Sequence, residues 1–323
     1  MNETINALFR RFDYQKYACF IALIILFTAS SILSPYFFQV RNLLNILRQV
    51  SYTGIIALGM TFVIISGGID LSVGSVAAFN ASVGILFLNY LMKVFSNEFL
   101  AMAGGIIAAL VMGFLSGAMN GLMVSRGNIA PFIATLGSMA IFRSLSLFIG
   151  SAGEIRSVSI HYGNFGMESI LFIPVPVFVM LFLTVVLSIV LNNTRYGRYL
   201  CAVGSNARVA AFSAINVDRI KFITYTICGF IVSISAIMLS SRFNAVSTSN
   251  LGMGFELDAI AAVIIGGTPM SGGRGTVWGT IMGAVILGII NNMLNMLGVS
   301  PYLQGTVKGL VIIGAVYIQR QKA

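Results

Sequence analysis

The sequence predicts an all-α polytopic membrane protein with about ten transmembrane helices. Of its 323 residues, 58% are hydrophobic and 9% are charged, whereas an ordinary soluble domain carries roughly 25% charged residues. About 20 apolar residues cross the roughly 30 Å hydrocarbon core of a bilayer as a helix. The apolar runs of this chain are too long and too evenly apolar for barrel strands. Because backbone groups in lipid must bond one another, we expect helices.

Ten apolar runs follow one another along the chain, and we expect residues 1–323 to form a single transmembrane domain. The first run follows basic residues, as the core of a signal peptide would. No small-residue cleavage site comes after it, so we interpret it as a retained helix. The second and eighth runs are short for a full crossing. The runs lie near residues 17–34, 52–66, 73–92, 100–124, 132–150, 170–192, 221–241, 256–266, 276–297 and 303–319.

Lysine and arginine are distributed as expected for a chain with both termini in the cytoplasm. With ten crossings, twelve basic residues fall inside and five outside, which satisfies the positive-inside rule. A net charge of +10 can also indicate nucleic-acid binding, but these basic residues are scattered between apolar runs, so we expect no nucleic-acid partner. The inside residues are Arg10, Arg11, Lys16, Arg126, Arg195, Arg198, Arg208, Arg219, Lys221, Arg274, Arg320 and Lys322, and the outside residues are Arg41, Arg48, Lys93, Arg156 and Arg242.

A weak internal repeat relates two parts of the chain, about residues 50–150 and about residues 221–319. Its two halves join successive crossings at opposite faces of the membrane, which indicates an inverted repeat of the kind found in transporters. The matching positions are Gly117, Asn120, Gly127 and the pair Pro131 and Phe132 in the first part, and Gly288, Asn291, Gly298 and the pair Pro301 and Tyr302 in the second.

Many glycines stand at small-xxx-small spacing inside the apolar runs. Examples are Gly113, Gly117 and Gly121 in one run, and Gly279 and Gly283 in another. In lipid such residues let two helix backbones approach closely. We therefore expect these glycines to lie where helices pack against each other.

The segment GGIDLSVGS at residues 67–75 places an acid between two apolar runs. Glycines permit a non-helical backbone, and an acid near membrane depth is costly unless it faces a cavity, a partner or water. The segment predicts a broken helix or tight turn beside a polar pathway. Alternatively, Asp70 caps the N-terminus of the helix that follows it.

The connection at residues 193–221 is polar, basic and on the predicted cytoplasmic side. We expect a short helix over residues 205–215, capped by Ser205 or Asn206 and with apolar positions such as Val209. A short amphipathic helix in such a loop either lies on lipid headgroups or docks into another protein. Composition alone favours neither reading.

No segment supplies the groups needed for covalent catalysis. The glycine-rich stretch at residues 257–276 lacks the Lys-Ser or Lys-Thr ending and the preceding strand of a phosphate loop. Cys19, Cys201 and Cys228 form no paired motif, and His161 has no triad or metal spacing around it. We expect neither a metal site nor an enzyme active site.

Three segments stand out together: GGIDLSVGS at 67–75, NTRYGRYLCAVGSN at 193–206 and LDAIAAVIIGGTPMSGGRGTVWGT at 257–280. In this order they resemble the membrane permease of ribose-type (carbohydrate uptake) ATP-binding-cassette importers, a bacterial inner-membrane family related to branched-chain amino acid permeases. The resemblance covers essentially the whole chain and includes NNMLNMLGVSPYLQ at 291–304. Pro269 departs from the residues often found after Gly-Gly-Thr in the family, a change compatible with the assignment.

The resemblance implies a type II importer-like fold, with two subunits of about ten transmembrane helices each around a central path. It implies that the chain is not an enzyme and binds no cofactor, because ATP and Mg are held by a separate ATPase subunit. The other implied partners are a periplasmic sugar-binding protein, a second permease copy or paralogue (homo- or heterodimer), and membrane lipid. The implied cargo is ribose or a related monosaccharide, imported across the bacterial inner membrane.

The resemblance also makes residues 193–221 a coupling loop, which sits in a groove of the ATPase and transmits its closure. For this, the loop must be joined rigidly to the helices on either side. We expect Gly197 and Gly204 to form its corners. The coupling candidates are Arg195, Gly197, Arg198, Gly204, Ser205, Asn206 and Arg208.

Two further groups of residues are candidates for contacts with the sugar and with the binding protein. A hydroxyl-rich cargo needs donors and acceptors that replace water during passage; for each asparagine the alternative is an interhelical hydrogen bond. Arginines at the outer face either pair with acids of the binding protein or extend to lipid headgroups. The translocation-path candidates are Gly68, Asp70, Ser72, Asn80, Asn120 and Asn291, and the docking candidates are Arg41, Arg48, Arg156 and Arg242.

An ion-gradient-driven secondary transporter of a small polar solute is the alternative function, because an inverted repeat permits it too. Buried ionisable residues suited to a proton relay are scarce in this sequence, and only Arg143, Lys308 and Asp70 qualify. Dependence of transport on an ATPase subunit would favour the importer. Dependence on a proton or sodium gradient would favour the secondary transporter.

Overall fold

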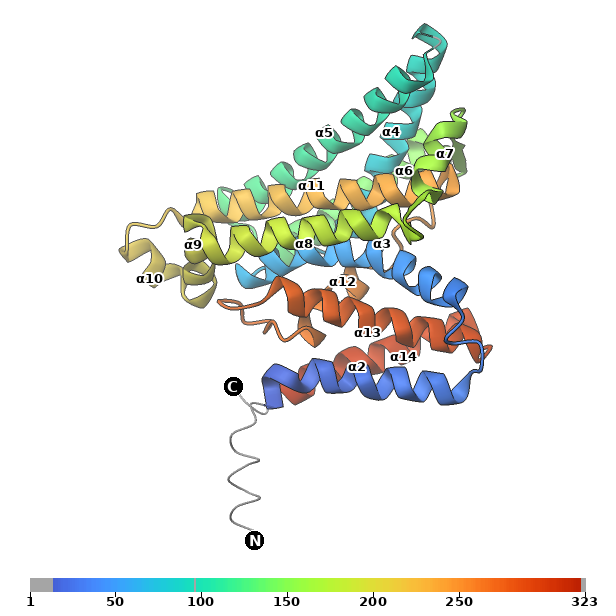
Figure 1. Cartoon of the computed structure of the whole chain (residues 1–323). Helices are drawn as coiled ribbons and strands as arrows, with labels where there is room; N and C mark the ends of the chain where they lie inside the picture. The colour runs from blue at the N-terminus through green and yellow to red at the C-terminus, as the bar shows by residue number, and fades with distance from the viewer. Residues whose placement is uncertain (1–13, 96, 321–323) are drawn as a thin grey trace.

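The computed structural model describes the backbone of residues 14–95 and 97–320, and their side chains except those of residues 14–22, 301, 312 and 315–320. It is built almost entirely from helices (Figure 1). The longer helices are α2 (Tyr14–Leu33), α3 (Val40–Ile65), α4 (Val73–Phe95), α5 (Glu98–Ser125), α6 (Pro131–Ile149), α8 (Val175–Asn193), α11 (Val217–Phe243), α13 (Val277–Met296) and α14 (Pro301–Arg320). The short elements are β1 (Glu154–Arg156), α7 (Ile160–Met167), β2 (Ser169–Ile170), β3 (Ile173–Pro174), α9 (Arg195–Ser205), α10 (Ala207–Phe212), β4 (Ala245–Ser247) and α12 (Phe255–Ile265).

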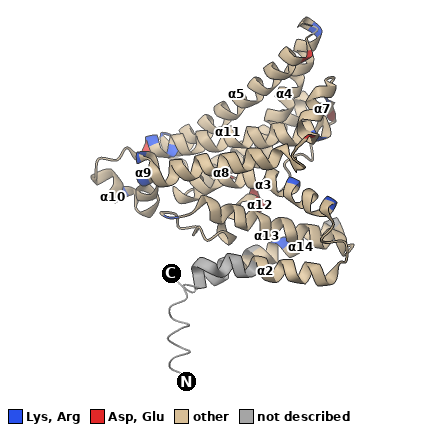
Figure 2. Cartoon of the chain, in the orientation of Figure 1, with Lys and Arg blue, Asp and Glu red and all other residues tan. Residues whose placement is uncertain are grey.

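Each of the ten predicted apolar runs coincides with a helix. Among the described residues, seven helices are long and apolar enough to cross a membrane: α3, α4, α5, α6, α8, α11 and α13. The chain is therefore a multi-pass membrane protein. Figure 2 agrees, because most Lys and Arg positions lie near α9 at one end, and near α7, the α4–α5 connection and the start of α3 at the other. The predicted cytoplasmic termini include residues 1–13 and 321–323, which lie outside the described residues.

Two helix boundaries differ from the prediction, each for a local reason. The second run was expected at residues 52–66, but α3 begins at Val40, because its first three turns are polar enough to hide the helix. The sixth run was expected at 170–192, but α8 begins at Val175 after the β2–β3 hairpin. Pro176 occupies the first turn of α8, where its missing N–H is not needed.

Helix α3 lies at the centre of the molecule, and its C-terminal half is buried almost completely. Helices α8, α11, α12 and α13 pack around it (Figure 1). On the far side of α11, α5 packs along α11, and α4 packs between α5 and α6. Two short antiparallel strands, β1 and β4, join the segment after α6 to the end of α11.

The predicted close packing at glycines is confirmed between α5 and α11. Gly113, Gly117 and Gly121 face α11, and a Cβ at Gly117 would lie 2.5 Å from the Tyr225 carbonyl oxygen. Gly229 of α11 faces α5 in return. The predicted glycines of α13 face α12 in the same way. Backbones therefore touch at both interfaces, as expected for helices that pack in lipid.

Candidate functional site

A buried network of hydrogen bonds surrounds the turn between α3 and α4. The Asp70 carboxylate accepts from the Ser72 backbone N–H at 2.9 Å and from the Ser72 hydroxyl at 2.6 Å. The Asn120 amide of α5 donates to Ser72 Oγ at 2.8 Å and to Asp70 Oδ2 at 3.4 Å. Ser138 of α6 donates to Asn120 Oδ1 at 2.5 Å. None of these four residues is more than 2% exposed.

The carbonyl oxygen of Ile69 extends the network to α6 and α11. It accepts from the Tyr225 hydroxyl at 3.2 Å and from the Thr135 hydroxyl at 3.4 Å. Gly68 lies so close that a Cβ there would overlap the Tyr225 hydroxyl. Gly67 has a φ of +82°, which glycine adopts without strain. The tight turn expected here is present, and it connects the ends of α3 and α4 to α5, α6 and α11.

Four of the translocation-path candidates, Gly68, Asp70, Ser72 and Asn120, therefore lie together. Asp70 accepts the amide of the residue before Val73, the first residue of α4, so it fixes the start of this helix. Asn120 makes the interhelical hydrogen bond that was its alternative role. The polar atoms of this group are directed at one another.

The remaining path candidates, Asn80 and Asn291, lie apart from this network. Asn80 is fully buried in α4, and neither of its amide atoms has a hydrogen-bond partner within the described residues. Asn291 lies in α13, and its buried Oδ1 has no partner there either. Buried amide groups normally form hydrogen bonds. Neither Asn80 nor the Asn291 oxygen is open to a solute in this conformation.

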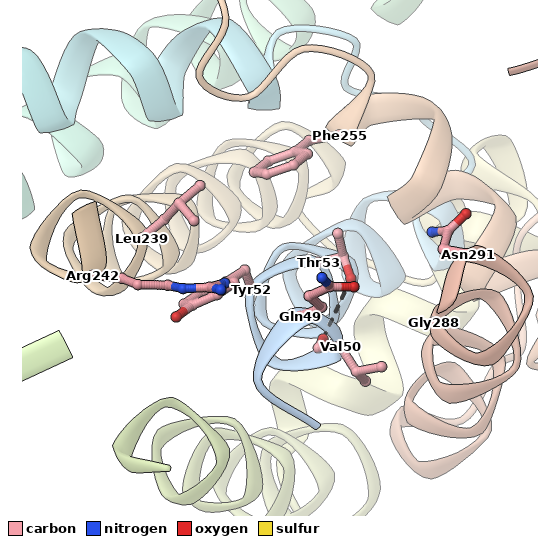
Figure 3. Close-up of a pocket in the computed structure, with 9 residues that line it drawn as sticks. All are labelled: Gln49, Val50, Tyr52, Thr53, Leu239, Arg242, Phe255, Gly288 and Asn291. Carbon is pink, nitrogen blue, oxygen red and sulfur yellow. Dashed lines mark hydrogen bonds between the residues drawn. The ribbon is translucent and has the colours of Figure 1, made fainter. Parts of the chain in front are cut away.

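Asn291 lines a pocket of about 210 Å³ between α3, α11, α12 and α13 (Figure 3). Its other polar lining residues are Gln49, Tyr52 and Thr53 of α3 and Arg242 of α11. The Arg242 guanidinium lies 5.8 Å from the centroid of the Tyr52 ring. The apolar lining of the pocket comes from Val50, Leu239 and Phe255. Gly288 completes the lining and lets α13 approach Val50 of α3 closely.

The sequence did not single out Gln49, Tyr52 or Thr53. Gln49 lies before the second predicted run, 52–66, which begins with Tyr52 and Thr53, so the face that the three residues share was not recognised. Their spacing of three and four residues would have indicated it, because residues so spaced are neighbours on a helix surface.

The docking candidates lie in the first half of α3, in β1 and in the last turn of α11. Arg41 and Arg156 are exposed. Arg48 is half-buried, and its Nε has no partner within the described residues. Arg242 is half-buried as well and packs on the ring of Tyr52. Arg41 and Arg156 are thus the two candidates that are open to contact from outside.

The basic connection between α8 and α11 forms two helices. Helix α10 is a shorter form of the helix expected over residues 205–215, and α9, which precedes it, was not predicted. Helices α9 and α10 meet at Asn206, whose side chain accepts from the backbone N–H groups of Arg208 at 3.0 Å and Val209 at 3.1 Å. Asn206 is therefore the cap of α10. Ser205, the other residue predicted for this role, donates to a carbonyl within α9.

Gly197 and Gly204 lie inside α9, so the expectation that they form the corners of the loop was wrong. A Cβ at Gly204 would overlap the carbonyl oxygen of Ile65, at the end of α3, and would lie 2.7 Å from the nitrogen of Gly273. A Cβ at Gly197 would overlap the carbonyl oxygen of Leu191 in α8. Both glycines let α9 pack tightly, and displacement of α9 must therefore press on α3 and α8.

Helix α10 presents an exposed apolar face next to basic side chains. Phe212 is 92% exposed and Val209 is 58% exposed. The coupling candidates Arg195, Arg198 and Arg208 are exposed as well. An exposed phenylalanine beside arginines fits either a protein groove or lipid headgroups.

Lys308 and Arg143, the other two candidates for a proton relay, are held in structural contacts. Lys308 of α14 pairs with Asp258 of α12 at 3.0 Å. Arg143 of α6 donates to the carbonyl oxygens of Thr248 and Leu251, each at 3.0 Å. Within the described residues, no group of three or more His, Cys, Asp or Glu side chains could hold a metal ion.

Residues 42–316 match a protein-family model described as the permease component of the branched-chain amino acid transport system. This span reaches from the first turn of α3 into α14 and includes both the Asp70 network and the α9–α10 loop. The chain belongs to this permease family. A comparison with solved structures found no match.

The permease is 41% identical to the ribose import permease protein RbsC of Bacillus subtilis (strain 168) over 312 residues, which cover 96% of this chain and 94% of the relative. It is 37% identical to the D-allose transport system permease protein AlsC of Escherichia coli (strain K12) over 308 residues, 95% and 92% of the two chains. It is 34% identical to the galactose/methyl galactoside import permease protein MglC of Haemophilus influenzae over 330 residues, 97% and 96% of the two chains.

Proposed function

We propose that this permease is the transmembrane subunit of an ATP-binding-cassette importer and forms the translocation path for a monosaccharide. The observation that carries the proposal is its near full-length similarity to permeases named for ribose, allose and galactose. Ribose or a related sugar is the proposed cargo, delivered by a periplasmic binding protein. Arg41 and Arg156, which are exposed, are the proposed contacts for that protein.

The partners follow from the same proposal. A separate ATPase subunit holds ATP and Mg, so the permease itself binds no cofactor. A second copy or a paralogue completes the path. The exposed face of α10, with Phe212 and Arg208, docks into the ATPase, and the tight contacts of α9 transmit the movement to α3 and α8.

We also propose ten crossings arranged as an inverted repeat in the bacterial inner membrane, with the α9–α10 end in the cytoplasm. Helix α5 ends beside the start of α11, because Gly121 packs against Phe222. Helix α13 begins beside the end of α9, because Gly273 packs against Ser205. The two helices that carry the matching repeat positions therefore run in opposite directions, as an inverted repeat requires.

The gradient-driven transporter is the weaker alternative. A proton relay needs ionisable groups that can change partners inside the membrane. Asp70 is enclosed in its hydrogen bonds, Lys308 is paired with Asp258, and Arg143 is bound to backbone carbonyls. These contacts favour a permease that is moved by a partner.

Phe212→Ser tests the proposal at the coupling loop. The variant removes an exposed apolar side chain and should leave the fold intact. We expect a roughly tenfold loss of the ATP hydrolysis that sugar-loaded binding protein stimulates, the size typical of an interface hot spot. The measurement is ATPase activity of permease, ATPase subunit and binding protein reconstituted together.

The matched control is Phe132→Ser, which removes another exposed phenylalanine, 56% exposed, at the start of α6 and outside α10. Its ATPase activity should stay close to that of the wild type. Equal activity of the Phe212→Ser variant and the wild type would contradict the coupling role of α10. Failure of the wild type to couple sugar-loaded binding protein to any ATPase subunit would contradict the proposed function.

A further inference from the structure

Helix α12 begins inside the membrane rather than at one of its faces. Its C-terminal end, at Gly266, packs against Gly279 at the start of α13. One turn earlier, Ala262 packs against Gly283, so the two helices are antiparallel. One further turn places Asp258 beside the middle of α13, a helix of 20 residues that is long enough to cross the membrane. Asp258 therefore lies near the middle of the hydrocarbon core.

At this depth Asp258 forms an ion pair with Lys308 of α14, with Nζ and Oδ2 3.0 Å apart. The pair is not sealed by protein, because 27% of the Lys308 side chain and 14% of the Asp258 side chain are exposed. A charged side chain at the centre of a bilayer is costly, and those that occur there face the bundle interior or a water-filled cavity. The exposed edge of this pair is therefore unsuited to lipid.

The start of α12 beside the pair is open. Met253 is 75% exposed and Leu257, one turn further along, is 56% exposed. A Cβ at Gly254 would meet nothing within 4 Å. Residues 251–254 form turns and not helix, and such backbone is tolerated at membrane depth only where protein buries it or where it lines a water-filled cavity. Because Met253 and Gly254 are open, their position favours water.

The ion pair keeps groups that a polar solute can use. A lysine ammonium has three donors and a carboxylate has about four lone-pair sites, and the contact between Asp258 and Lys308 uses one of each. A Cβ at Gly305 or at Gly309 would meet nothing within 4 Å, so there is room beside Lys308 along α14. A sugar hydroxyl both donates and accepts, and it can bond to both members of the pair.

We infer that Asp258 and Lys308 line a water-filled translocation path and bind hydroxyl groups of the sugar as it passes the middle of the membrane. This inference rests on the proposed function. It places sugar contacts on α12 and α14, away from the Asp70 network, whose polar atoms already bond one another. A site at mid-depth beside an interrupted helix is an arrangement that transporters use.

Leu257→Cys tests whether this face is wet, and it leaves the ion pair intact. The three native cysteines are replaced by alanine, and a membrane-impermeant, anionic thiol reagent is added to proteoliposomes that contain the permease. The matched control is Phe182→Cys, because Phe182 is 68% exposed near the middle of α8, a helix without charged residues. A thiol reacts as its thiolate, which apolar surroundings disfavour. We expect Leu257→Cys to react roughly tenfold faster than the control, or more.

The double variant Asp258→Lys with Lys308→Asp tests contact with the sugar. It restores the ion pair with its charges exchanged, so a pair that only stabilises the fold should keep the sugar preferences of the wild type. Uptake of labelled ribose, allose and galactose is measured with the ATPase subunit and the binding protein. We expect ATP-driven uptake whose ratios among the sugars change roughly three- to tenfold, the size of about one hydrogen bond. Asp258→Asn, which keeps the size of the side chain, gives the same readout if the exchanged pair does not fold.

The outcomes separate the path contact from the function. Leu257→Cys that reacts no faster than Phe182→Cys would show a face covered by lipid or by protein, and would overturn the inference. Wild-type sugar ratios in the exchanged pair and in Asp258→Asn would assign the pair to stability and also overturn it, while the proposed function stands. If the wild type shows no ATP-driven sugar uptake, the proposed function fails and the sugar contact fails with it.

Discussion

Asp70 remains inside an apolar bundle because hydrogen bonds replace the water that it has lost. Two of them come from Ser72, two residues away, and a third comes from Asn120, on another helix. The hydrogen bonds between Asp70 and Ser72 depend only on the local segment GGIDLS, whose glycines permit the turn. The hydrogen bond from Asn120 depends on α5 lying beside the turn. The buried Asp70 side chain is fully hydrogen-bonded only where the turn and α5 are both in place.

Asn120→Ala should destabilise the permease. It removes two donated hydrogen bonds and the acceptor of Ser138, and it leaves buried groups unpaired. We expect a loss of about 1–3 kcal/mol, measured as a lower unfolding temperature in detergent. Asn192→Ala, on the exposed face of α8, is the control and should change little. A variant that unfolds like the control but transports poorly would instead place Asn120 in the translocation path.

The sequence could single out Asp70 and Asn120, because polar residues are conspicuous in apolar runs. It could not show that they bond each other, since their contact depends on helix packing. The pocket was less accessible to prediction. Asn291 was recognised through the repeat, but Tyr52 and Arg242 come from helices whose relative placement no local pattern encodes.

Helix positions were predicted well, because each apolar run is a local signal. Helix boundaries were predicted wrongly where polar residues or a hairpin interrupted the apolar pattern. Polar residues hid the start of α3, and a hairpin precedes α8. The helix expected in the coupling loop is present as α10, capped by Asn206, but α9, which ends at the same residue, was missed. Gly197 and Gly204 serve helix packing rather than the corners of the loop.

Gly117→Ala tests the packing of α5 on α11. The added methyl group would press on the Tyr225 carbonyl oxygen, 2.5 Å from its ideal position. We expect a loss of about 1–3 kcal/mol of stability, typical of overpacking, seen as a lower unfolding temperature. Gly137→Ala is the control, because a Cβ at Gly137 meets nothing within 4 Å, and alanine favours a helix over glycine. Equal unfolding temperatures for the two variants would contradict the close contact of these helices.

For the whole molecule, composition alone predicted a multi-pass helical membrane protein. The number of crossings depends on how the shorter helices sit in the bundle. Seven helices meet the length and hydropathy that a crossing needs. Helix α12 has 11 residues, so it rises only roughly 16 Å, about half of the hydrocarbon core. In the sequence, α12 and the glycines that follow it therefore predict an incomplete crossing. How deep α12 lies in the membrane depends on the helices around it.

Uptake of labelled ribose, allose and galactose tests most directly what drives transport through the permease. Proteoliposomes would contain the permease with its ATPase subunit and binding protein, with ATP on the ATPase side. We predict uptake that stops without ATP hydrolysis and continues when proton and sodium gradients are dissipated. Uptake that is indifferent to ATP and stops when those gradients are dissipated would contradict the importer and establish a gradient-driven transporter instead.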